Sequence, residues 1–73
     1  MVYEYGRLSL RIKERCRSQR RFAQEMGLSE RTVSLKLSGR REWKQSEIQN
    51  ACKILEIDYS DIPLYFFKVK VQN

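Results

Sequence analysis

The most informative part of the chain is SQRRFAQEMGLSERTVSLKLSGRR, residues 18–41. The apolar residues of its first half are Phe22, Ala23 and Met26. Positions with this spacing lie on one side of a helix. Ser18 is a good N-cap for that helix, and Gly27 suits the left-handed conformation just past a helix end. These signals predict a short helix that stops at Gly27.

A second helix is predicted directly after this turn. Ser29 is a suitable cap, and Leu28 provides a hydrophobic contact beside the turn. Val33 and Leu37 are four residues apart and form the inward stripe of the second helix, which ends at residues 38–39. The opposite face is then free, and it carries Glu30, Arg31, Ser34, Leu35 and Ser38.

Two further amphipathic helices flank this pair. The first covers about residues 6–17 and places Leu8, Ile12 and Cys16 on one stripe. The last carries Ile48, Ala51, Cys52 and Leu55, with Ile57 closing its stripe. Residues 40–42 form the loop that precedes the last helix, and Trp43 is expected to anchor this loop to the core. Asp58 or Ser60 would cap a short turn just before Pro63.

The C-terminal tail, residues 64–73, is predicted to be extended. Phe67, Val69 and Val71 alternate with lysines, which is typical of a half-buried strand. Three arrangements remain open: pairing with residues 3–5 of the same chain, pairing with a second copy, or a frayed end. The prediction is therefore one all-α domain over residues 1–73, a bundle of four to five short helices with at most a short C-terminal strand.

The charge of the chain is distributed unevenly. Residues 1–44 hold 12 Lys and Arg against 5 Asp and Glu, whereas residues 45–73 hold 3 against 4. Guanidinium groups match phosphate geometry, so a basic surface rich in arginine favours a nucleic-acid partner. A solvated basic surface that only provides solubility is the simpler alternative.

Several classes of protein are excluded by composition. The chain has no histidine, which removes His-based triads and Cys–His zinc sites. Cys16 and Cys52 stand alone in apolar-periodic stretches and are read as buried, reduced thiols rather than a disulfide. No apolar run is long enough for a signal peptide or a membrane span, so a cytoplasmic protein is expected.

Residues 18–41 resemble the helix-turn-helix of the lambda repressor and Cro class. The matching elements are Gln19, Phe22-Ala23, Gly27, Ser29, Val33-Ser34 and Gly39-Arg40. With QSEIQNACKILEI at residues 45–57 and IPLYFF at residues 62–67, the whole chain resembles small Cro-like regulators of temperate phages of Gram-positive bacteria. The resemblance implies a lambda repressor-like bundle whose second short helix enters the major groove of DNA.

Residues on the free face of that helix are then candidates for base recognition. Arg31 would bond to guanine, Glu30 would accept from a cytosine amine, and Leu35 would touch a thymine methyl group. Ser34 would reach a base or a phosphate. The residues assigned to the DNA backbone are Ser18, Gln19, Arg20, Ser29, Lys36, Ser38, Arg40, Arg41 and Lys44. Arg20 is equally well read as solvated helix surface, and Glu30 as a partner of the helix dipole.

Two functions follow. The leading one is a Cro-like transcription regulator that binds double-stranded operator DNA in a lysis–lysogeny switch. If it binds as a homodimer, a roughly palindromic operator is expected. The alternative is an antirepressor that binds the phage repressor protein, alone or together with DNA, through Arg31 and Leu35. Leu35 raises this alternative because it is apolar on an exposed face. An enzyme is remote, and no cofactor or metal is expected, since no paired carboxylates, activated nucleophile or phosphate-binding glycine loop is present.

Overall fold

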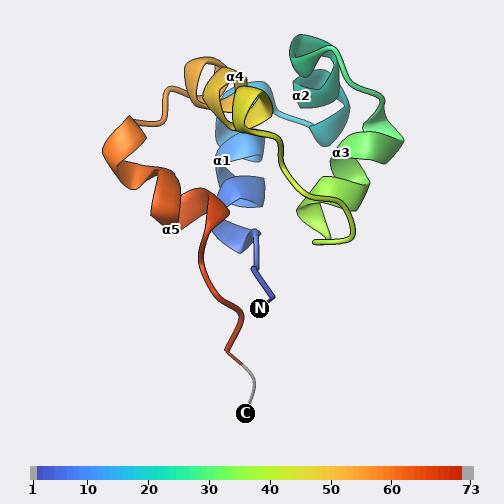
Figure 1. The fold of residues 1–73 in the computed structure, drawn as a ribbon. Helices are drawn as coiled ribbons and strands as arrows, with labels where there is room; N and C mark the ends of the chain where they lie inside the picture. Colours follow the sequence, from blue (N-terminus) through green and yellow to red (C-terminus); the bar gives the residue numbers. More distant parts are fainter. Residues whose placement is uncertain (1, 72–73) are drawn as a thin grey trace.

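The computed structural model describes residues 2–71, and within them the chain is helical (Figure 1). The elements are α1 (Gly6–Cys16), α2 (Gln19–Met26), α3 (Glu30–Leu37), α4 (Gln45–Leu55), the 3-10 turn η1 (Tyr59–Asp61) and α5 (Ile62–Phe66). Helix α1 packs against α2, α4 and α5, while α2 also contacts α3 and α4. The predicted all-α bundle is confirmed. In the described part of the chain no helix is long and apolar enough to cross a membrane.

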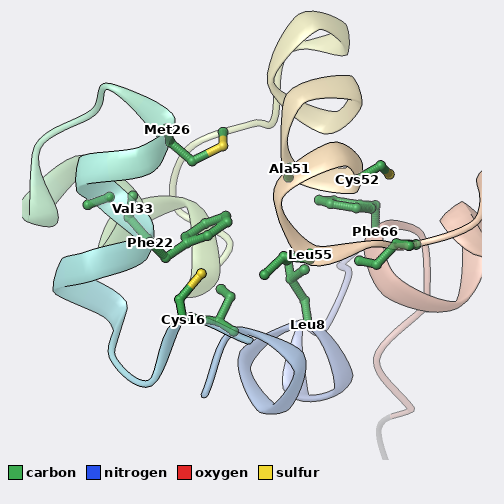
Figure 2. Close-up of a cluster of buried hydrophobic side chains, with 12 residues drawn as sticks. Leu8, Cys16, Phe22, Met26, Val33, Ala51, Cys52, Leu55 and Phe66 are labelled. Atoms are coloured by element: carbon green, nitrogen blue, oxygen red, sulfur yellow. The ribbon is translucent and has the colours of Figure 1, made fainter. Parts of the chain in front are cut away.

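The core forms where the apolar stripes of the helices meet. Figure 2 shows Phe22 of α2, Leu55 of α4 and Leu8 of α1 converging from three directions. These three side chains have no exposed surface. Burying a side chain of this size contributes about 1.5–3 kcal/mol relative to leaving it in water. The buried apolar set is Leu8, Ile12, Cys16, Phe22, Ala23, Met26, Val33, Ala51, Cys52, Leu55, Ile57 and Phe66.

The connection between α2 and α3 follows the predicted turn. Ser18 Oγ accepts from the Arg21 N–H at 3.1 Å, and Ser29 Oγ accepts from the Thr32 N–H at 3.1 Å, so each helix begins with a side-chain cap. Gly27 has φ 72°, in the left-handed region. The Leu28 N–H then donates to the Ala23 carbonyl at 2.9 Å. Helices α2 and α3 therefore form a helix-turn-helix arrangement.

The predicted inward residues of α3, Val33 and Leu37, both pack in or against the core, but Lys36 was wrongly placed at the surface. Lys36 is 2% exposed, whereas Leu37 is only half-buried. The ammonium group of Lys36 lies 2.7 Å from Glu47 Oε1 and donates to the Glu42 carbonyl at 2.8 Å. A buried charge is tolerated when it is paired and hydrogen-bonded in this way. Lys36 is thus an interior residue, and its assignment to a surface that contacts a DNA backbone is incorrect.

Some of the basic charge of α1 serves the fold. Arg11 Nε donates to the Leu55 carbonyl at 2.9 Å, and its Nη2 donates to the Glu56 carbonyl at 2.9 Å. Arg15 pairs with Glu56 at 2.8 Å. The two Arg11 hydrogen bonds satisfy carbonyl groups at the end of α4, which have no partner within that helix. Arg11 is consequently a structural link between α1 and α4.

The C-terminal segment is helical for longer than predicted. Leu64, Tyr65 and Phe66 belong to α5, so the extended tail does not begin at residue 64. Pro63 suits the first turn of a helix, where its missing N–H needs no partner. Gln72 and Asn73, which the prediction included in the tail, lie outside the described residues.

After α5 the chain returns to its own N-terminal segment, and both ends lie on the same side of the bundle (Figure 1). Tyr3 and Val69 form an antiparallel bridge, and the Lys70 N–H donates to the Val2 carbonyl at 2.7 Å. The rings of Tyr3 and Phe67 meet edge to face at 5.7 Å. Within residues 2–71 this pairing is a single bridge and not the optional strand, and it joins the two ends of one chain.

Candidate functional site

The outer face of α3 is open to a partner. Glu30, Arg31 and Ser34 are exposed, and Leu35 is half-buried. Val33, which is fully buried, turns the opposite side of α3 into the core. The structure therefore presents on one face the four residues that the sequence proposed for base contacts.

The residues expected to flank that face are mostly at the surface too. Ser18 and Arg20 are exposed at the start of α2, and Gln19 is half-buried. After α3, the N–H groups of Arg40 and Arg41 both donate to the Leu35 carbonyl, at 2.9 and 3.2 Å. This bond pattern holds the two arginines close to the C-terminal end of α3. Ser29, Ser38 and Lys44 are also exposed.

A second surface, which the sequence did not predict, lies between α4 and the C-terminal elements. It is a groove of about 740 Å³, named here the α4–α5 groove. Its lining residues are Trp43, Gln45, Ser46, Ile48, Gln49, Tyr59, Ile62 and Phe67. Of these, Tyr59 is 54% exposed and Phe67 is 47% exposed. Apolar side chains gathered at a surface hollow are typical of sites that bind protein.

Trp43 forms a wall of this groove and ties it to the core. Its ring lies 5.2 Å from that of Phe66, edge to face, and 6.4 Å from that of Tyr5. The indole Nε1 is buried and has no hydrogen-bond partner. Trp43 thus anchors the loop after α3, as predicted, but it also shapes a surface. The only signal for this surface in the sequence was the density of aromatic residues between positions 59 and 67.

The electrostatics of Glu47 reflect its partnership with Lys36. Partial burial by itself would raise the pKa of this carboxyl group. The hydrogen bonds from Lys36 and from the Lys44 N–H, together with the charges of both lysines, outweigh that effect and hold the pKa below its usual range. Glu47 is therefore the charged acceptor of an interior ion pair.

Neither cysteine is arranged for chemistry. Cys16 and Cys52 are both free and buried, as predicted. Burial raises the pKa of the Cys16 thiol, and its hydrogen bond to Glu25 Oε2 at 3.1 Å raises it further, to about 11. Burial also raises the pKa of Cys52. Thiols of this kind are largely protonated and unreactive at neutral pH.

Comparison with known proteins identifies a relative that matches over nearly the whole of both chains. The solution structure of the modulator of repression (MOR) of the temperate bacteriophage TP901-1 from Lactococcus lactis is similar to this chain, with 51% sequence identity and a TM-score of 0.81. The match covers 99% of this chain and 97% of that one. No curated protein matches the chain.

This relative corrects the leading functional prediction. The chain was expected to be a Cro-like transcription regulator that binds operator DNA. The relative is instead a modulator of repression, which favours the alternative of a switch component acting with the phage repressor. The expected phage context is supported by the same match.

The family assignment covers nearly the whole chain and carries no function of its own. Residues 1–69 match the model of a family described as protein of unknown function, DUF739. The chain therefore belongs to the DUF739 family.

Proposed function

We propose that this protein modulates repression in a temperate phage by binding the phage repressor protein. The observation that carries the proposal is the full-length likeness to the modulator of repression of TP901-1, at 51% identity. The bundle offers a partner two candidate surfaces, the outer face of α3 and the α4–α5 groove.

The first candidate surface for the repressor is the outer face of α3. Leu35 is apolar and only half-buried, so a protein partner would remove its remaining surface from water. Arg31 is exposed four residues earlier, one helical turn away. Arginine is over-represented among the residues that dominate binding energy at protein interfaces. Arg31 and Leu35 are the proposed contacts on this face.

The α4–α5 groove is the second candidate surface for the same partner. Tyr59 and Phe67 stand at its edge and are about half exposed. Aromatic side chains of this kind act as anchors when a partner surrounds them and excludes water. The repressor would gain apolar contact here and charged contact at the exposed arginines after α3.

Binding to the purified repressor of the same phage tests the proposal directly. Calorimetric titration is expected to show a 1:1 complex with a dissociation constant in the micromolar range or below, about −8 kcal/mol or stronger. Absence of a complex at high micromolar concentrations of both proteins would refute the proposal.

Single substitutions then separate the two surfaces. Arg31→Ala and Leu35→Ala probe α3, while Tyr59→Ala and Phe67→Ala probe the groove. A contact residue is expected to weaken binding by at least about tenfold, which corresponds to ~1.4 kcal/mol. Lys53→Met, an exposed position on α4, serves as the matched control and is expected to bind like the wild type. Wild-type affinity in all four surface variants would place the repressor elsewhere.

A further inference from the structure

The buried Lys36 joins three elements of the bundle through one ammonium group. It arises from α3, pairs with Glu47 in the first turn of α4, and donates to the Glu42 carbonyl in the loop between them. The same nitrogen lies 5.9 Å from the centre of the Trp43 ring. Burying two charges costs desolvation that their attraction only partly offsets, so such a pair is a weak source of stability.

Trp43 stands between the two backbone groups that this ion pair holds. On one side, the Glu42 carbonyl accepts from Lys36. On the other side, the Lys44 N–H donates to Glu47 Oε1 at 2.8 Å, the same oxygen that Lys36 contacts. The indole N–H of Trp43 has no partner of its own. The direction of this side chain is therefore set by the backbone on either side and by its aromatic neighbours.

We propose that Lys36 is a positioning residue for the α4–α5 groove: by fixing the backbone on both sides of Trp43, it sets the groove wall that the indole forms. The positioning of Trp43 follows from the contacts of Lys36 and Glu47 with the backbone at Glu42 and Lys44. Its consequence for affinity rests on the proposed repressor binding.

The first test uses fluorescence, since Trp43 is the only tryptophan of the chain. Lys36→Met removes the ammonium group at similar side-chain length, and Lys36→Met/Glu47→Gln removes both charges while keeping an acceptor for the Lys44 N–H. Both variants are expected to show a red-shifted Trp43 emission and stronger quenching by acrylamide. The double variant is expected to melt near the wild type, whereas Lys36→Met, which leaves the Glu47 charge without its partner, is expected to melt at a lower temperature. Lys53→Met is expected to match the wild type in all three measurements.

Unchanged emission and quenching in folded variants would overturn the positioning role. If Lys36→Met alone does not fold, because the Glu47 charge is left unpaired, the double variant decides. Failure of the double variant to fold as well would show that the pair is needed for stability, and would also overturn the proposal.

The second test measures affinity for the purified repressor. The double variant is expected to bind about tenfold more weakly, ~1.4 kcal/mol, while Lys53→Met binds normally. If Lys36 acts through Trp43, adding Lys36→Met/Glu47→Gln to Trp43→Phe causes little further loss. Fully additive losses, or wild-type affinity in the double variant, would overturn the route through Trp43. A wild-type protein that does not bind the repressor would refute only the proposed function, since the fluorescence test does not depend on it.

Discussion

Gly27, the residue that ends α2, permits a quantitative test of the turn that orients α3. Its φ of 72° lies in the left-handed region, and a Cβ built on it meets no atom within 4 Å. Replacement by alanine therefore creates no clash, and its cost is the intrinsic penalty of an L-residue in this conformation, about 1–2 kcal/mol. That is a large fraction of the total free energy of unfolding, which is about 0.05–0.15 kcal/mol for each of the 73 residues. In a domain of this size each kcal/mol lowers Tm by about 4–8 °C.

Thermal unfolding followed by circular dichroism measures this loss. Gly27→Ala is expected to melt below the wild type, and Gly27→Asn by a smaller amount, because asparagine tolerates the left-handed region. Gly6→Ala is the matched control. Gly6 begins α1 without a positive φ, and an added Cβ would lie 3.5 Å from its nearest neighbour, Glu4 Oε1. That substitution is expected to be neutral or to stabilise by about 0.4–1 kcal/mol. A Gly27→Ala protein as stable as the wild type would refute the reasoning.

Three further predictions concern titration and packing. Because the pKa of Glu47 is lower in the folded protein than in the unfolded chain, its ion pair contributes its full stability above the unfolded pKa of Glu47. That stability is lost as the pH falls through the lower pKa of the folded state. Acid denaturation should show this loss in the wild type and less of it in Glu47→Gln. The raised pKa of Cys16, about 11, means that this thiol stabilises the fold below its ordinary pKa and that the contribution disappears as pH rises from about 9 to 11. Urea titrations at alkaline pH should detect that loss in the wild type but not in Cys16→Ala, and alkylation of the folded wild type at neutral pH should be much slower than that of the unfolded chain. Phe22→Ala, at a position with no exposed surface, should lose about 3–5 kcal/mol, whereas Leu10→Ala, at a position 60% exposed, should stay within about 0.5 kcal/mol when both are measured by denaturant unfolding. Equal losses at the two positions would contradict the assignment of the core.

The helix-turn-helix segment was predictable because its signals are short-range. Ser18, Gly27 and Ser29 act on backbone groups within four residues of themselves, as caps and as a left-handed turn. The inward stripes of α1, α2 and α4 repeat with the helical period and were placed correctly.

The choice between Lys36 and Leu37 was not predictable in the same way. Both lie one turn beyond Val33, at spacings of three and four, so periodicity allows either to face inward. The interior offers the Lys36 ammonium a carboxylate from Glu47 and a carbonyl from Glu42. Those partners come from the following helix and loop, and an apolar pattern does not reveal them.

The prediction of an extended C-terminal segment from residue 64 was wrong for a related reason. The alternation at residues 67–71 suggested a strand, but α5 continues through Phe66, whose ring packs into the core against Trp43. Burial of that ring favours the helix over an extended chain, and only the last described residues pair with the N-terminal segment.

The residues of the α3 face do not by themselves determine what this face binds. A row with Arg31 and Ser34 exposed and Leu35 half-buried suits either a DNA groove or a protein surface, because both partners accept arginine and tolerate a small apolar contact. The full-length likeness to a modulator of repression favours a switch component over a Cro-like regulator, and the role of this face remains part of the proposal.

Residue order alone thus determined four amphipathic helices, the caps of α2 and α3 and the turn between these two helices, since each depends on interactions a few positions apart. Only the folded arrangement decided that Lys36 is an interior cation, that Phe66 belongs to a helix, and that Trp43, Tyr59 and Phe67 share a groove. These features join residues that are distant along the chain, and their energies depend on which partners the completed bundle brings within contact.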